Sequence, residues 1–351
     1  MLLNLLMSVW ARAIEGDFPG VRARCYADDA SVLSGLPPAV LGRVLAATEE
    51  FARLTGMKLN IPKCHAWSCS KQGRRNLRRL FPNTDDAPTP SVVLTERNLG
   101  AQLSFTHAAA GTPDTLERHQ ASKDACLRIE AVPMPLEAKA SLVEGAVNPK
   151  ALFDCSVSHI TKKNLRNMRT RVTHAIWGRG KFRCQEVLFT VLTRGHAVDP
   201  LQARVMRIMK SAKRMLGRYE AQRERWLDIL SQRVNTGSRL QAGPVAQFLW
   251  ALKQMQWELS PNDFHVYSHT GEEISLIACD SGAFEHSMRE ALRLRLWKEG
   301  AQRREDMLGA EAPQGVDRSS TTALLNKLHG RERRLLQRII LGSTMSRDRA
   351  M

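Results

Sequence analysis

The chain has 351 residues and a formal net charge of +17, from 52 Lys and Arg against 35 Asp and Glu. This length can bury a sizeable core in two or more domains, and the cationic excess suits a polyanionic partner such as nucleic acid. Seven Cys residues without a paired framework favour a nuclear or cytoplasmic protein over a secreted one, and no segment has the apolar length that would indicate a membrane protein.

The first 34 residues are predicted to form a helix and a hairpin. A helical apolar repeat predicts a packed helix over residues 1–14, and the absence of a basic leading segment argues against a signal peptide. Glu15 and Asp17 fall in a predicted loop over residues 15–20, where they are expected to be solvated. Apolar runs then predict a hairpin over residues 21–34.

Asp28 and Asp29 lie at the predicted turn of this hairpin. Two adjacent carboxylates repel each other, and a divalent cation removes that penalty. Hard oxygen ligands are those that Mg²⁺ prefers, so the pair is a candidate metal site. The alternative is a plain turn, because Asp favours turns for its own backbone hydrogen bonding.

A helix is predicted over residues 38–55, where Gly56 ends it, and short strands at residues 58–60 and 64–68. A basic helix is predicted over residues 71–80. A loop over residues 82–88 and strands at residues 92–95 and 99–105 follow. Cys64, His65 and Cys69 could suggest zinc, but a structural site needs four ligands and no second pair is nearby, so packing roles are expected.

Beyond residue 112 the pattern is helical almost throughout. One predicted helix has an apolar face formed by Leu165, Met168, Val172 and Ile176, with Lys162, Arg166, Arg169 and Thr173 on another side. A second has an apolar stripe formed by Val205, Met209, Ala212 and Leu216. The side chains predicted to lie opposite that stripe are Arg207, Lys210, Arg214 and Arg218. Such a face either tracks a phosphate backbone or is simply solvated.

Three further features complete the helical part. Trp226, Trp250 and Trp257 are predicted to pack between helices rather than to stack on bases. A hairpin is predicted over residues 264–277, with its turn at Thr270-Gly271. A polar linker over residues 309–320 precedes a final basic helix, predicted over residues 332–341.

Four segments resemble, in order, motifs of non-LTR (LINE-like) retrotransposon reverse transcriptases. Residues 25–33, with Tyr-Ala-Asp-Asp, resemble the YxDD motif, and residues 1–7 resemble the helix that follows the "QGDPLSP" segment. Residues 51–64 resemble the "F…SGLKLNxxKT" element, and residues 98–103 resemble the "YLGxxL" primer-grip element. The resemblance is clear to about Phe105 and general beyond it.

The resemblance implies an α+β fold in three parts. Residues 1–108 would be a partial right-hand polymerase palm, an antiparallel sheet with helices. Residues 109–235 would be a mostly α-helical thumb, and residues 236–351 a helical C-terminal region with one hairpin and a basic tail. The implied activity is RNA-directed DNA synthesis with an RNA template, a DNA primer and Mg²⁺, or Mn²⁺ in its place.

The resemblance also implies roles for single residues. Asp28 would be the main metal ligand and Asp29 its neighbour, while Tyr26 would contact the primer end or serve as a strand aromatic. Lys63 would be a general acid near the departing pyrophosphate, or an ordinary solvated lysine. Leu99 and Gly100 would shape the primer grip.

In this family an earlier strand supplies a third carboxylate, whereas this sequence starts in a later helix. Two-metal phosphoryl chemistry needs both ions held about 3.5–4 Å apart, which one Asp pair does not normally manage. The chain is therefore expected to be an inactive fragment of a reverse transcriptase. The alternatives are a non-enzymatic nucleic-acid-binding remnant and a decayed element without function.

Overall fold

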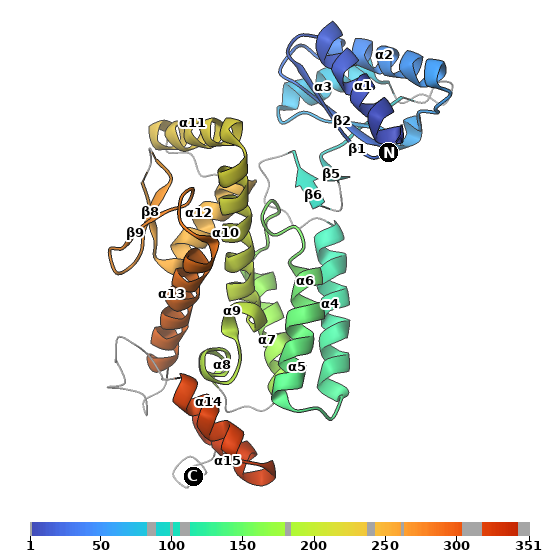
Figure 1. Cartoon of the computed structure of the whole chain (residues 1–351). Helices are drawn as coiled ribbons and strands as arrows, with labels where there is room; N and C mark the ends of the chain where they lie inside the picture. The colour runs from blue at the N-terminus through green and yellow to red at the C-terminus, as the bar shows by residue number, and fades with distance from the viewer. Residues whose placement is uncertain are drawn as a thin grey trace. The chain divides into compact units, whose positions relative to one another are not determined.

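The computed structural model describes residues 2–82, 89–98, 101–105, 113–179, 184–236, 243–260, 263–303 and 318–342. These residues are mostly helical with small sheets, as the predicted α+β class requires (Figure 1). The chain divides into two compact units. Unit 1 contains residues 1–96 and 104–106, and unit 2 contains residues 97–103 and 107–351.

Unit 1 is built on a helix packed against a hairpin. Its elements are α1 (Leu2–Asp17), β1 (Val21–Tyr26), β2 (Asp29–Ser34), α2 (Ala39–Thr55), η1 (Ile61–Lys63), β3 (His65–Ala66), α3 (Lys71–Leu80) and β4 (Ser91–Val92). The core joins α1, β1 and α2 through Met7, Trp10, Ile14, Val21, Ala23 and Val44. The predicted first helix and hairpin are therefore confirmed. The loop expected from residue 15 is wrong, because α1 continues to Asp17 and Glu15 lies in its last turn.

The helix predicted over residues 38–55 and the basic helix over residues 71–80 are both confirmed. Gly56 ends α2 at φ 70°, a left-handed conformation that glycine adopts without strain. Ser70 caps α3, and its hydroxyl oxygen accepts from the Gly73 N–H at 2.8 Å.

The short strands are less well predicted than the helices. The strand expected at residues 58–60 is wrong, because these residues are irregular and lead into the 3₁₀ turn η1. Pro62 in that turn has no N–H to donate to a sheet. The strand expected at residues 64–68 is reduced to β3, which pairs with β4 in parallel.

The strands before residue 106 do not merge into one antiparallel sheet. Those that the structure describes form separate pairs: β1 with β2, β3 with β4, and β5 (Thr95–Asn98) with β6 (Ala101–Ser104). The predicted loop at residues 82–88 lies almost wholly outside the described residues, as does the primer-grip pair Leu99 and Gly100.

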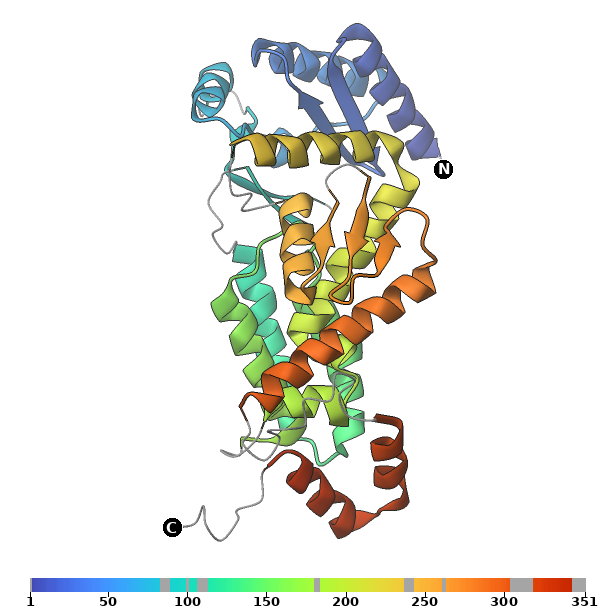
Figure 2. The same ribbon diagram turned by 90° about the vertical axis from the view of Figure 1, so that its left-hand side faces the viewer.

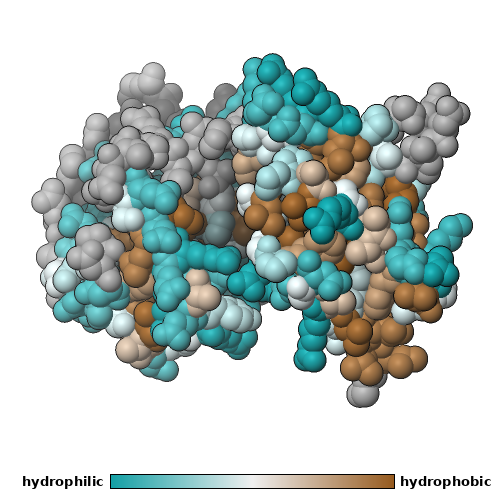
Figure 3. Space-filling view, turned by 90° about the horizontal axis from the view of Figure 1, so that it is seen from above, coloured by the Kyte–Doolittle hydropathy of each residue, from teal (hydrophilic) through white to brown (hydrophobic). Residues whose placement is uncertain are grey.

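Unit 1 leaves apolar side chains at its surface, among them Leu2, Leu5 and Val9 of α1. Figure 3 shows such apolar patches beside hydrophilic ones. Helix α1 thus has apolar residues on two faces, and the described part of unit 1 covers only one of them.

Beyond residue 106, the described part of unit 2 is helical apart from one small sheet. Its helices are α4 (Pro113–Ala131), α5 (Leu136–Leu142), α6 (Asn148–Ala151), α7 (Lys162–Trp177), α8 (Gln185–Val187), α9 (Gly195–Val198), α10 (Pro200–Arg218), α11 (Glu220–Thr236), α12 (Pro244–Met255), α13 (Ser281–Ala301), α14 (Arg318–Lys327) and α15 (Gly330–Ile340), with π-helical turns η2 (Val143–Val147) and η3 (Leu188–Leu192). Its strands are β7 (Glu258–Leu259), β8 (His265–Tyr267) and β9 (Glu273–Ser275). None of the described helices combines the length and apolar character needed to cross a bilayer.

Two cores hold unit 2 together. The first joins α7, α10, α12 and α13 with the three-stranded sheet, which lies beside α12 and α13 in Figure 2. Trp226 packs edge-on against Phe248 and Trp257 against Phe284, so the predicted packing role of these two tryptophans is confirmed. The second core joins α4, α5, α7 and η3 with the end of α15.

The late hairpin and the final helix are confirmed with small changes. Strands β8 and β9 are antiparallel, with Gly271 at φ 81° in their turn, and β7 adds a third strand that was not predicted. The last helix begins at Gly330 and ends at Ile340. Most of the predicted polar linker lies outside the described residues.

The apolar face of α7 is buried as predicted, but two residues assigned to its other side are not on a solvated surface. Thr173 is buried, and its hydroxyl donates to the Arg169 carbonyl at 2.8 Å. Arg169 is largely buried because its Nε donates to the fully buried carboxylate of Asp199. The charge of Arg169 is therefore paired with Asp199 inside unit 2.

Candidate functional site

The acidic tip of the β1–β2 hairpin is exposed and has a defined geometry. Ala27 and Asp28 form the turn, and Tyr26 pairs with Asp29 at the end of the ladder. Ala27 has φ 53°, a region that residues with a Cβ adopt infrequently. The continuous register from Val21 and Ser34 up to the tip holds this turn, so the ladder fixes where both carboxylates emerge.

Among the described residues, the tip offers two carboxylate side chains as metal ligands. Asp28 and Asp29 are both accessible, and carboxylate oxygens suit Mg²⁺. Across the residues that the structure describes, no group of three His, Cys, Asp or Glu side chains could hold a metal ion. Of the two acids in the last turn of α1, Asp17 is exposed, whereas Glu15 is already engaged: its Oε1 accepts from the Ala23 N–H at 3.0 Å and pairs with Arg24 at 3.2 Å.

The other predicted polymerase residues lie as follows. Tyr26 is 69% exposed, so its ring is accessible and is not a half-buried strand aromatic. Lys63 is exposed on η1 and has no ion-pair partner among the described residues. Leu99 and Gly100 are outside those residues.

The Cys64–Cys69 region has structural contacts that explain its residues. His65 places Nδ1 2.7 Å from the Ser91 hydroxyl and Nε2 3.4 Å from a Glu96 carboxylate oxygen, which links β3 to the strands that follow. Burial, with a contribution from Glu49, raises the pKa of the Cys64 thiol, which disfavours the thiolate that zinc binds.

The stripe predicted for α10 is confirmed. Its members Val205, Met209, Ala212 and Leu216 are all buried. On the other side, Lys210, Arg214 and Arg218 are exposed and Arg207 is partly exposed. Lys210 pairs with Glu285 of α13 at 2.6 Å. Arg207, Arg214 and Arg218 have no ion-pair partner in the part of the chain that the structure describes, and we call these three the α10 cationic face.

The start of α10 is fixed by a buried ion pair. The Asp199 carboxylate accepts from the Leu201 N–H at 3.0 Å and from Arg169 Nε at 2.8 Å, and Pro200 occupies the first turn. Burial raises the pKa of Asp199, and the Arg169 guanidinium opposes that rise. One side chain therefore caps α10 and joins it to α7.

A second buried arginine, Arg204, also belongs to α10 and was not predicted. It is 1% exposed, and its guanidinium lies 4.0 Å from the centre of the Trp250 ring. Its Nη2 donates to Gln247 Oε1 at 2.7 Å and its Nη1 to the Ile160 carbonyl at 3.1 Å. Burial lowers the pKa of Arg204 to about 10, since the described residues offer it no carboxylate. In the sequence, apolar residues follow Arg204 at helical spacing, four and eight residues later, and this spacing was the signal that its side chain is buried.

His119 of α4 is another buried polar group in this part of unit 2. Its Nε2 has no hydrogen-bond partner among the described residues, and its carbonyl accepts from Arg171 at 3.5 Å. Burial, with the nearby charge of Arg171, lowers the pKa of His119 below its ordinary value. This imidazole is therefore neutral in the folded protein at neutral pH.

No protein-family model matches the chain, and the comparison with curated proteins gives no significant match. The family resemblance therefore depends on the four sequence motifs alone.

His119 gives a pH-dependent prediction. Below pH 6.5 the His119 imidazole is protonated in the unfolded chain while it is still neutral in the folded protein. The unfolded state therefore binds more protons, and the stability of the folded protein falls as the pH is lowered. We expect His119→Gln to reduce the loss of unfolding free energy between pH 7.5 and 5.5, at most by about 1.4 kcal/mol per pH unit. Urea unfolding at pH 7.5 and at pH 5.5 measures this free energy. His269→Gln, at an exposed position, is the control, and an equal effect there would contradict the assignment.

The acidic tip predicts weak metal binding. Because affinity rises with ligand number and charge, we expect Asp28 and Asp29 to bind Mg²⁺ only in the millimolar range. Titration calorimetry should show this binding abolished in Asp28→Asn/Asp29→Asn. The control is Glu272→Gln/Glu273→Gln, which removes two adjacent exposed carboxylates from another hairpin turn. Micromolar binding that survives the Asp28/Asp29 change would place the metal elsewhere.

Proposed function

We propose that this chain is part of an RNA-directed DNA polymerase of the non-LTR retrotransposon class, and that unit 2 binds the template–primer duplex along α10. The motif order supports the polymerase assignment. The observation that carries nucleic-acid binding is the α10 cationic face, whose three arginines have no ion-pair partner among the described residues.

The geometry of α10 suits a duplex backbone. From Arg207 to Arg218 the helix rises roughly 16 Å, at 1.5 Å per residue. Duplex nucleic acid carries about one phosphate charge per 1.7 Å, so several phosphates lie within that length. The buried stripe holds the helix, and Asp199 fixes its first turn, so the arginines are presented on a rigid support. Contacts to phosphates alone give binding without sequence preference.

In this proposal the hairpin supplies part of the metal site. Asp28 and Asp29 would provide oxygen ligands for Mg²⁺, an ion that in polymerases activates the primer 3′ oxygen and stabilises the leaving pyrophosphate. Tyr26 would contact the primer end, and Lys63 would serve near the pyrophosphate. Because the described residues place no third metal ligand with Asp28 and Asp29, we expect this chain to bind nucleic acid without extending it.

A non-enzymatic nucleic-acid-binding protein is the second candidate function. The observation that favours it is the incomplete donor set, since Glu15 is engaged with Ala23 and Arg24 rather than directed to a metal. The two candidates share the α10 surface and differ in whether synthesis ever occurs. Primer extension separates them.

The α10 cationic face predicts salt-dependent binding to an RNA–DNA duplex. Arg207→Ala/Arg214→Ala/Arg218→Ala should reduce the slope of log affinity against log salt by roughly three, about one unit for each phosphate that the variant no longer binds. Adding Lys210→Ala should change the slope less, because Glu285 already pairs with it. A fluorescence anisotropy salt series measures the slope.

The matched control for this prediction is Lys162→Ala/Lys163→Ala/Arg166→Ala, which removes three exposed charges from α7. An equal reduction of the slope in this control would show that only total charge matters. An unchanged slope in the folded α10 variant would show that its cationic face is merely solvated.

The two carboxylates at the hairpin tip give a second prediction, which concerns catalysis. With an RNA template, a DNA primer and Mg²⁺ or Mn²⁺, the purified chain should give no primer extension, since two carboxylates do not hold two ions. Asp28→Ala is the control variant. Robust synthesis that Asp28→Ala abolishes would show that other residues of this chain complete the metal site, and would exclude the non-enzymatic alternative.

A further inference from the structure

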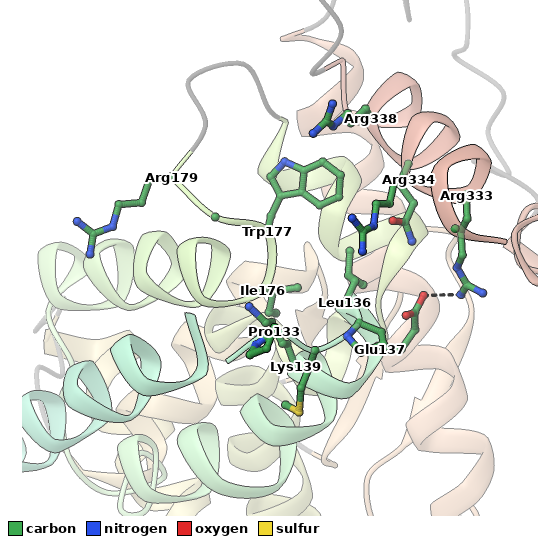
Figure 4. Close-up of a pocket in the computed structure, with 15 residues that line it drawn as sticks. Pro133, Leu136, Glu137, Lys139, Ile176, Trp177, Arg179, Arg333, Arg334 and Arg338 are labelled. Carbon is green, nitrogen blue, oxygen red and sulfur yellow. Dashed lines mark hydrogen bonds and ion pairs between the residues drawn. The ribbon is translucent and has the colours of Figure 1, made fainter. Parts of the chain in front are cut away.

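A groove of about 860 Å³ lies in unit 2, and none of its lining residues is assigned to the polymerase motifs. Three segments line it: the turn before α5 with the start of α5, the end of α7 with the two residues after it, and one side of α15 (Figure 4). Its apolar lining includes Pro133, Leu136, Ile176 and Trp177. Its cationic side chains are Lys139, Arg179, Arg333, Arg334 and Arg338, against the single carboxylate of Glu137 among the lining residues.

Most of these cations have partners, but two form no ion pair with any described residue. Arg333 pairs with Glu137 at 2.6 Å, and Arg179 pairs with Glu130 at 2.9 Å. Lys139 donates to the Glu130 carbonyl at 3.0 Å. Arg334 and Arg338 are exposed and form no ion pair within the described part of the chain.

Arg334 and Arg338 are one helical turn apart, so they lie on the same side of α15. Two like charges at this spacing destabilise a helix, and an anion between them removes that cost. Guanidinium groups match phosphate oxygens in a bidentate geometry. These two side chains are therefore suited to a phosphate.

Helix α15 is anchored rather than loosely attached. Leu341, directly after it, is buried in the second core, and its carbonyl accepts from the Cys184 N–H at 3.2 Å. The Arg333–Glu137 ion pair joins α15 to α5. The groove thus has fixed walls, which lowers the entropy cost of ligand binding.

Trp177 supplies a partly exposed aromatic surface beside these cations. The indole packs against the second core and also lines the groove, where Figure 4 shows it near Arg334 and Arg338. Stacking of a base on an aromatic side chain strengthens binding and tolerates any sequence, because every base has a π-face. An indole next to two arginines therefore combines stacking with phosphate binding.

We infer that this groove binds a segment of single-stranded nucleic acid, with a base on Trp177 and adjacent phosphates on Arg334 and Arg338. The inference rests on the proposed function, because it assigns a second nucleic-acid surface to the same unit. The volume suits one or two nucleotides, since pockets of about 300–1,000 Å³ enclose ligands of that size. An acidic peptide would use the arginines but gain little from the indole.

The test is fluorescence anisotropy with the full chain and a short labelled oligo(U) strand, alongside the RNA–DNA duplex. Arg334→Gln/Arg338→Gln should weaken oligo(U) binding at least tenfold and lower its salt slope by roughly 1.4, or about 0.7 per phosphate of a single strand. Trp177→Leu should weaken it roughly 5- to 100-fold and leave the salt slope unchanged. The matched charge control is Lys253→Gln/Lys298→Gln, two exposed lysines outside the groove.

The two surfaces can be separated by their variants. The groove variants should leave duplex binding along α10 unchanged, and the α10 triple variant should leave oligo(U) binding in the groove unchanged. If the α10 variant has no effect on the duplex while the groove variants still weaken oligo(U) binding, the α10 assignment fails and the groove stands.

Three results would overturn the inference. The first is unchanged oligo(U) affinity in the folded Arg334→Gln/Arg338→Gln protein, and the second is an equal weakening in the lysine control. The third is competition by oligo-glutamate as effective as that by unlabelled oligo(U) of the same charge, which would identify a site for polyanions of any kind. Folding of Trp177→Leu is checked by its urea midpoint, and the arginine double variant tests the site independently of that core residue.

Discussion

The Asp199–Arg169 ion pair is the interaction on which the arrangement of unit 2 depends. A fully buried carboxylate is unfavourable unless it is paired and hydrogen-bonded, and Asp199 has both an arginine and a backbone N–H. Since Arg169 belongs to α7 and Asp199 starts α10, the pair sets both the position and the direction of α10. Removing either partner would leave an uncompensated buried charge, a change that typically costs about 3–5 kcal/mol. The Asp199–Arg169 ion pair therefore determines where the solvent-exposed side of α10 lies within unit 2.

Unit 2 therefore uses its cations in two physically different ways. Arg169 and Arg204 are buried: the first is paired with a carboxylate, and the second is held by two carbonyl oxygens and the Trp250 ring. The α10 cationic face and the groove residues Arg334 and Arg338 are accessible and have no ion pairs among the described residues. Of these two groups, the second is the one placed to attract a polyanion, because the first is neutralised or enclosed.

Much of the fold follows from sequence periodicity. The helices α2, α3 and α10 and the β1–β2 hairpin were predictable because their signals are local: a cap, a glycine stop or an alternating apolar pattern. The strand predicted at residues 58–60 failed because Pro62 favoured a 3₁₀ turn over a ladder. Strand β7 was missed because it has only two residues, and its pairing to β8 depends on tertiary packing. Helix positions were thus easier to predict than strand partners.

The candidate sites show the same limit at the level of side chains. The position of Asp28 and Asp29 at a turn was predictable, because an apolar run lies on either side of them in the sequence. The roles of Arg169 and Arg204 were not, because their partners lie 30 or more residues away in the sequence. The groove is an extreme case, since Trp177 and Arg334 approach each other only after α15 packs on the second core. A long flexible cation finds its partner through the tertiary fold, so a cationic residue in a helical pattern does not by itself show whether its charge faces solvent or core.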